Sequence, residues 1–120
     1  MPTRVNALPL FEKSVKQLRK KFPAIDDIVN ELVNQIEADE RPGDKIPNVG
    51  YDVYKVRLKN PDAQSGKSGG FRAIYYVRLE NVVFMMTVYS KSQQSDVNIR
   101  ELRQMIEDIL ASEDEFDEDD

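Results

Sequence analysis

The sequence predicts an α+β fold in which helices pack against a small antiparallel sheet, in the order β-α-α-β-β-β-α. Residues 48–91 contain three runs in which apolar and polar side chains alternate, as they do in half-buried strands. The segments before and after this region repeat apolar residues at helical spacing. The 120 residues are enough for one ordinary domain, which we place at residues 1–111, followed by an acidic tail at 112–120.

Residues 3–41 are expected to form a short strand followed by two helices. The strand covers residues 3–7, and Pro9 suits the first turn of the first helix. The apolar stripe of this helix is Phe11, Val15, Leu18 and Phe22. The second stripe is Ile25, Ile28, Val29, Leu32 and Ile36. Because the connection between them is short, we predict an antiparallel helical hairpin, followed by a loop at residues 44–49.

The three strands that follow carry cations on one face. Alternation places Lys55 with Arg57 on the first strand, and Arg72 with Tyr76 on the second. The third run, residues 82–89, is apolar on both faces, which is typical of a central strand. Residues 79–82 fit a two-residue hairpin in which Asn81 has a positive φ. We expect one sheet face to pack on helices and the other to expose these cations beside Tyr76 and Tyr89.

The connection at residues 60–70 contains the sequence SGKSGG. Its Gly-Lys-Ser resembles part of a phosphate-binding loop, but Pro61 stands where that motif requires a glycine. The motif also needs a helix after it, and here a strand pattern follows. We therefore predict a connector between strands, with Lys67 as a candidate substrate contact.

A last helix is expected after residue 94, with Ser95 or Asp96 as its N-cap. Its apolar stripe is Ile99, Leu102, Ile106, Ile109 and Leu110. Seven of residues 113–120 are acidic, so the net charge of −5 becomes slightly positive for the rest of the chain. We expect a solvated end without regular structure. The alternative is a tail that folds back on the cations and competes with RNA.

Composition excludes several kinds of chemistry. The chain has no cysteine, so it forms neither a disulfide nor a catalytic thiolate. It has no histidine, which removes the commonest general base and metal ligand, and we expect neither a metal site nor a cofactor. Acid–base catalysis would have to use Lys, Arg, Tyr or carboxylates. Without a membrane span or signal peptide in the pattern, we expect a soluble cytoplasmic protein.

One group of side chains indicates a binding function. It joins four cations to three aromatic rings: Lys55, Arg57, Arg72 and Lys91 with Tyr54, Tyr76 and Tyr89. Cations bind phosphates and aromatic rings stack on bases, so this group on a sheet suits single-stranded RNA. The alternative is that the charged residues only solvate an exposed sheet face.

The same residues carry a family resemblance over residues 11–110. The run YKVRL, then SGKSGGFRAIYYV, then a strand ending in VYSKSQQSDV and a helix, resembles the RelE/ParE superfamily of toxin–antitoxin toxins, closest to its RelE and HigB-type branch. The resemblance implies a RelE-like fold and a ribosome-dependent endoribonuclease that cuts mRNA and blocks translation. It also implies a cognate antitoxin, the ribosome and mRNA as partners.

In this family the RNA 2′-hydroxyl attacks the adjacent phosphate, leaving a 2′,3′-cyclic phosphate and a 5′-hydroxyl. The resemblance places catalytic cations at Lys55, Arg57 and Arg72, with Lys55 as base and Arg72 stabilising the phosphorane. Lys91 is a further catalytic candidate, and Tyr76, Tyr89 and Lys67 are candidate substrate contacts.

The pattern departs from RelE at two positions. Ser92 and Asn98 stand where RelE has an arginine after the last strand and a tyrosine at the start of the last helix. Two alternatives therefore stay open: a ParE-like toxin that inhibits DNA gyrase, and a catalytically inactive member that acts as an interaction partner.

Overall fold

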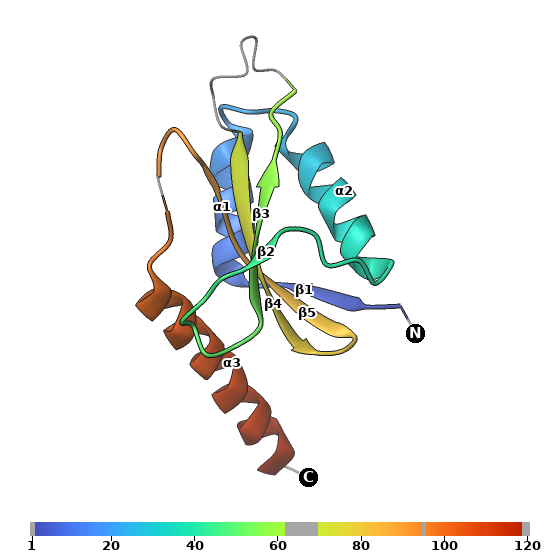
Figure 1. Cartoon of the computed structure of the whole chain (residues 1–120), viewed down its shortest axis with the longest axis vertical. Helices are drawn as coiled ribbons and strands as arrows, with labels where there is room; N and C mark the ends of the chain where they lie inside the picture. Colours follow the sequence, from blue (N-terminus) through green and yellow to red (C-terminus); the bar gives the residue numbers. More distant parts are fainter. Residues whose placement is uncertain (1, 62–69, 95, 119–120) are drawn as a thin grey trace.

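A five-stranded sheet with helices on both faces forms the body of the protein (Figure 1). The computed structural model describes residues 2–61, 70–94 and 96–118. In chain order the elements are β1 (Arg4–Ala7), α1 (Pro9–Arg19), α2 (Ile25–Glu37), β2 (Asp44–Lys45), β3 (Val53–Leu58), β4 (Phe71–Leu79), β5 (Val82–Ser90) and α3 (Ile99–Glu118). The predicted α+β class is confirmed.

The strands are arranged in the order β1-β5-β4-β3-β2. The predicted antiparallel meander of β3, β4 and β5 is present. Strand β5, which we expected to be central, is an inner strand between β1 and β4, and β4 is at the centre of the sheet. The sheet is nevertheless mixed, because β1 pairs parallel with β5. Residues 44–45 were expected in a loop but form β2, in which Asp44 pairs with Lys55. Two residues are too few for alternation to reveal a strand.

Helices α1 and α2 cover one face of the sheet with the apolar stripes that the sequence predicts. They run in opposite directions (Figure 1). Their main buried side chains are Phe11, Val15, Leu18, Ile25, Val29, Leu32 and Ile36. On the sheet these residues meet Phe71, Tyr75 and Met85, among others. Burial of these apolar stripes is the main force that fixes the two helices.

We had expected the opposite face of the sheet to be open to solvent, but it is partly covered. Helix α3 packs there through Leu102 and Ile106, against Ile74, Tyr76 and Met86 on the sheet. Helix α3 carries an apolar stripe of its own, which must be buried against something, and this face of the sheet is the apolar surface that it meets. Only part of the face is therefore left to the cations.

A bulge in β5 changes which side chains share a face. Ile74 pairs with Thr87, but the next residue, Tyr75, pairs with Met85. Strict alternation would place Tyr89 on the same face as Met85. Because of the extra residue, Tyr89 instead lies in the apolar cluster beside α3.

The ends of two elements differ from the prediction. The Glu80-Asn81 hairpin is present, but Asn81 is not among the residues with positive φ. A register irregularity between Val77 and Leu79 lies beside this turn. The N-cap of α3 is Asn98, whose Oδ1 accepts hydrogen bonds from the backbone of Arg100 (2.9 Å) and from that of Glu101.

Helix α3 continues to Glu118, where we expected a tail without regular structure. It leads away from the end of the sheet where β4 begins (Figure 1). None of the described helices is long and apolar enough to cross a membrane. Within the described ranges, no group of three or more acidic side chains is arranged to hold a metal ion.

Candidate functional site

The strand register brings the four predicted catalytic cations together. Arg57 lies directly opposite Arg72 across β3 and β4, and Lys55 lies two residues from Arg57. Lys91 follows β5, and its backbone N–H donates to the carbonyl of Gly70 at 3.0 Å. Together they line an open cleft of about 640 Å³, the cation cleft, formed by Gly43, Asp44, Lys55, Val56, Arg57, Arg72 and Lys91.

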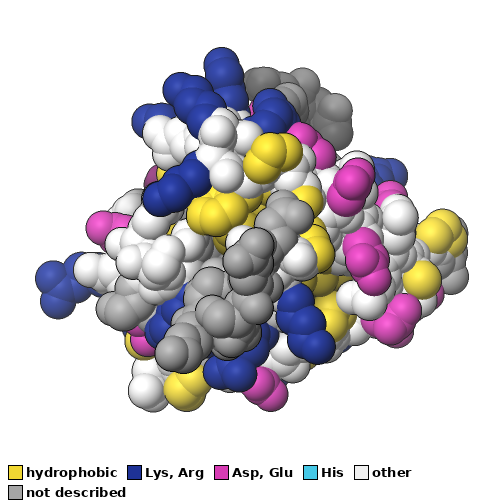
Figure 2. Space-filling view, turned by 90° about the horizontal axis from the view of Figure 1, so that it is seen from above, with side chains coloured by type: hydrophobic (Ala, Val, Ile, Leu, Met, Phe, Trp, Pro, Cys, Tyr) yellow, Lys and Arg dark blue, Asp and Glu magenta, His cyan; other side chains and the backbone are white. Residues whose placement is uncertain are grey.

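The cations of this cleft lie at different depths. Arg57 and Lys91 are exposed, and the Lys55 side chain is 38% exposed. Arg72 is only 8% exposed, and its Nη1 donates to the Phe71 carbonyl at 3.2 Å. We had expected an exposed Arg72, but β4 is an inner strand, so neighbours on both sides cover its stem. Figure 2 looks onto the end of the molecule where β4 begins, and Lys and Arg side chains lie at several places on this view.

Asp96 is the residue at this site that sequence reasoning missed. Its Oδ1 lies 3.4 Å from Lys55 Nζ and accepts a hydrogen bond from the Val97 backbone at 2.8 Å. That hydrogen bond, and then the charges of Lys55 and Lys91, hold the pKa of the Asp96 carboxyl below its usual range. We had named Ser95 or Asp96 as the helix cap, and nothing local in the sequence reveals that Asp96 has a partner 41 residues away.

The rim of the cation cleft is held by Tyr75. Its hydroxyl donates to the Pro42 carbonyl, and its ring stacks on Tyr54 with centroids 5.2 Å apart. Burial raises the pKa of the Tyr75 hydroxyl above its ordinary value, which already lies well above neutral pH, so the hydroxyl is protonated and can donate. This contact places Gly43 against β3, where a Cβ on Gly43 would collide with the backbone of Lys55 and Val56.

Gly43→Ala is expected to destabilise the fold and open the cleft. Gly43 has φ +92°, which costs an L-residue roughly 1–3 kcal/mol, and the collision with β3 adds to this. Detachment of β2 would move Lys55, so both stability and site geometry should suffer. Urea denaturation measures the loss of unfolding free energy.

Gly50→Ala is the matched control for this prediction. Gly50 has a similar φ of +89°, but a Cβ there would meet nothing within 4 Å. Its cost is therefore the backbone strain alone. If the two variants lose the same unfolding free energy, the close approach of Gly43 to β3 does not matter.

Two of the three predicted substrate contacts, Tyr76 and Tyr89, are not among the residues that line the cation cleft. Tyr76 is 4% exposed and its ring contacts those of Tyr51 and Phe84, so it is too buried for a base to stack on it. Tyr89 is 6% exposed, and its hydroxyl has no hydrogen-bond partner in the part of the chain that the structure describes. Burial, and then the charge of Asp96, raise the pKa of Tyr89. Lys67 lies outside the described residues.

The two positions that depart from RelE have local structural roles. The Ser92 hydroxyl lies 2.8 Å from that of Ser90, and Asn98 caps α3. Neither lines the cation cleft. The cleft therefore draws its positive charge from β3, from β4 and from Lys91.

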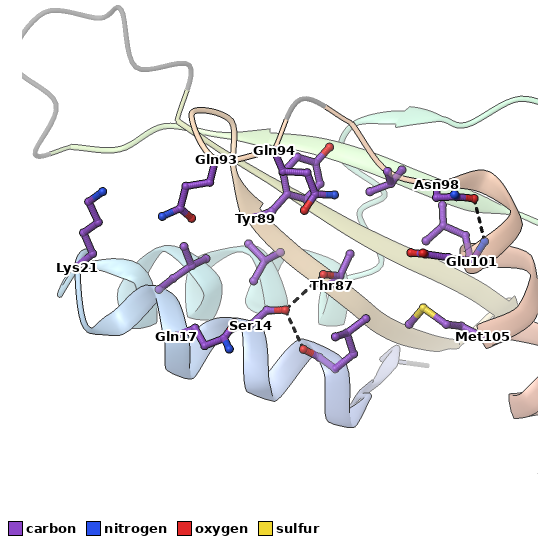
Figure 3. Close-up of a pocket in the computed structure, with 15 residues that line it drawn as sticks. Ser14, Gln17, Lys21, Thr87, Tyr89, Gln93, Gln94, Asn98, Glu101 and Met105 are labelled. Atoms are coloured by element: carbon purple, nitrogen blue, oxygen red, sulfur yellow. Dashed lines mark hydrogen bonds between the residues drawn. The ribbon is translucent and has the colours of Figure 1, made fainter.

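A second hollow, of about 460 Å³, lies between α1, β5 and the start of α3 (Figure 3). Ser14 of α1 faces Thr87 of β5 there, with their hydroxyl oxygens 3.4 Å apart. Its charged lining consists of Lys21 and Glu101, and the rest is amide, hydroxyl or apolar. With no excess of cations, this hollow is less suited to phosphate than the cation cleft.

Comparison with known proteins confirms the family resemblance. The family model described as the RelE toxin of the RelE / RelB toxin–antitoxin system matches residues 11–115. No curated protein matches the chain. Among solved structures, the fold resembles that of an arginine double mutant of the E. coli toxin RelE in the free state. The TM-score is 0.51 at 21% identity, over 79% of this chain and 90% of that one.

Proposed function

This chain belongs to the RelE toxin family, and we propose that it is a ribosome-dependent endoribonuclease that cleaves mRNA, blocks translation and is neutralised by a cognate antitoxin. The single observation that best supports cleavage is the cation cleft, in which β3, β4 and the end of β5 bring four cations together. A site without histidine, cysteine or a metal cluster in its described part can still stabilise a phosphorane through cations.

We assign each cation of the cleft a chemical role according to how deeply its side chain is buried. Arg72, at the buried position, donates to the oxygens of the scissile phosphate, where negative charge develops. Lys55, as the uncharged amine, takes the proton of the 2′-hydroxyl as the 2′-oxygen bonds to phosphorus. The bond to the 5′-oxygen breaks, and that oxygen takes up a proton from water as it leaves. Arg57 and Lys91, both exposed, hold the flanking phosphates.

The shape of the cleft supports a need for the ribosome. With Tyr76 and Tyr89 buried, the cleft presents cations but no open ring on which a base can stack. Phosphate contacts position RNA without reading its bases, and this protein alone would hold a free strand weakly. A ribosome that already holds mRNA in an extended conformation would supply the missing orientation.

Cleavage on translating ribosomes tests the proposal directly. We expect primer extension to show new 5′ ends on an mRNA that is being translated in the presence of the wild-type protein. The same RNA without ribosomes should stay intact, because the cleft lacks contacts that would orient it. Intact mRNA on actively translating ribosomes would contradict the nuclease assignment.

Induced expression separates this function from gyrase inhibition. A translation-blocking nuclease should stop protein synthesis before DNA synthesis, as incorporation of labelled precursors would show. If DNA synthesis stops first, the ParE-like alternative replaces the proposal. Normal growth at good expression of folded protein would favour the inactive interaction partner.

A further inference from the structure

We propose that Asp96 is an internal anion that pairs with Lys55, and that Lys55 must leave this carboxylate when a phosphate enters the cation cleft. The inference rests on the proposed function for the identity of the ligand, an RNA phosphate. It adds a regulatory residue beside the cleft. The charge of Asp96 would lower the affinity for free RNA, so that Lys55 binds only a strand whose phosphate contacts several cations of the cleft at once.

The geometry of Asp96 is that of a competitor with its own anchor. Its Oδ1 lies 3.4 Å from Lys55 Nζ, bridging β3 and the segment before α3. The Val97 N–H donates to the same oxygen at 2.8 Å, and Gln94 Nε2 donates to the Asp96 carbonyl at 2.7 Å. Because these contacts do not involve Lys55, the carboxylate stays in place when the lysine turns to another anion.

The charge of Asp96 acts on several groups of the site. It interacts electrostatically with Lys55 and Lys91, and also with the buried hydroxyl of Tyr89, on which the charge of Arg72 acts as well. One carboxylate therefore lowers the positive potential that would attract RNA to the cleft.

The strength of the ion pair suits displacement. The Lys55 and Asp96 side chains are 38% and 66% exposed, and ion pairs of this kind change equilibria by roughly two- to fivefold. A phosphate held by several cations at once can exceed that cost, whereas a single weak contact to Lys55 cannot. Asp96 thus favours RNA that engages the whole cleft over RNA that merely touches it.

Asp96→Asn tests the inference because it removes the charge and keeps an oxygen for the Val97 N–H. The probe is a short fluorescent single-stranded RNA with 2′-O-methyl groups, which cannot be cleaved by attack of the 2′-oxygen. At low salt, fluorescence anisotropy should show roughly two- to fivefold tighter binding than wild type. The plot of log affinity against log salt should become steeper by about 0.7, because Lys55 then neutralises one more RNA phosphate, from which condensed cations are released.

Asp44→Asn is the matched control, since Asp44 lines the same cleft and faces Lys55 in the register. It removes the same charge, but in the described part of the chain the ion pair of Lys55 is with Asp96. Its gain in affinity should be smaller, and Lys55→Ala should abolish the gain of Asp96→Asn. A gain no larger than that of Asp44→Asn, or one that survives Lys55→Ala, would overturn the inference.

A second probe separates this inference from the proposed function. Inorganic tripolyphosphate, followed by calorimetry, reports the competition for Lys55 without any RNA chemistry. If wild type cuts no mRNA but Asp96→Asn still binds tripolyphosphate more tightly through Lys55, the nuclease proposal fails and the inference stands. If wild type cuts mRNA and Asp96→Asn binds both probes like wild type, the inference fails alone. Absence of Lys55-dependent binding of either probe also overturns it.

Discussion

Arg72→Ala is expected to lower the rate of mRNA cleavage roughly a hundredfold or more. The change removes a donor to the charge that develops on the scissile phosphate, and loss of one such donor typically costs about 3 kcal/mol in the transition state. Lys55→Ala should cost a similar factor, because it removes the proposed proton acceptor. The measurement is the rate at which primer-extension products appear on translating ribosomes.

Two controls separate chemistry from folding in this experiment. Arg78 lies six residues further along β4, roughly 20 Å away and outside the cation cleft, so Arg78→Ala should cleave nearly as wild type does. Because Arg72 is buried, its alanine variant also loses packing, and thermal unfolding must be measured with it. Arg72→Lys keeps the charge but loses the planar guanidinium fork, so it should be impaired yet stable. Wild-type rates in both Arg72→Ala and Lys55→Ala would remove these residues from the mechanism.

Phe71→Ala is expected to cost the largest part of the folding stability, about 3–5 kcal/mol. Phe71 is 1% exposed, and its ring meets that of Phe22 edge to face with centroids 5.0 Å apart. Removing it leaves a cavity between the sheet and the segment that joins α1 to α2. For a domain of this size the midpoint of thermal unfolding should fall by on the order of ten degrees or more.

Leu79→Ala, at the other end of β4, is the control for that loss. Leu79 is 54% exposed, so its truncation should change stability by no more than about 0.5 kcal/mol. A melting temperature for Phe71→Ala as high as that of Leu79→Ala would show that Phe71 is not a core residue. The backbone carbonyl of residue 71, which accepts a hydrogen bond from Arg72, remains in the variant, so any loss of cleavage should follow the loss of folded protein.

The candidate site could largely be predicted from the chain itself. Alternation is a local property of an extended backbone, so it places Lys55 with Arg57 on one face of a strand wherever the strand lies. The hairpin between β4 and β5 then brings Lys91 back to the start of β4, near Arg72. The helical stripes were equally local, and α1, α2 and α3 form where their apolar spacing predicts.

What the sequence could not determine depends on contacts between distant segments. The two-residue β2, the burial of Arg72 and the ion pair of Asp96 with Lys55 all require knowledge of which strand or loop lies alongside which. The bulge in β5 reverses alternation, so the face of Tyr89 followed from pairing with β4 and not from spacing.

Apart from β2 and the end of α3, the sequence by itself determined which segments are helical, which are extended and which cations share a strand face, because these follow from backbone geometry within a few residues. Only the tertiary structure decided that α3 covers part of that face. Its stripe needed an apolar partner, and the free energy of burying it against Tyr76 and Met86 is a property of the assembled layers. The same packing buried the rings of Tyr76 and Tyr89, which we had expected to stack on bases, and left the cation cleft open.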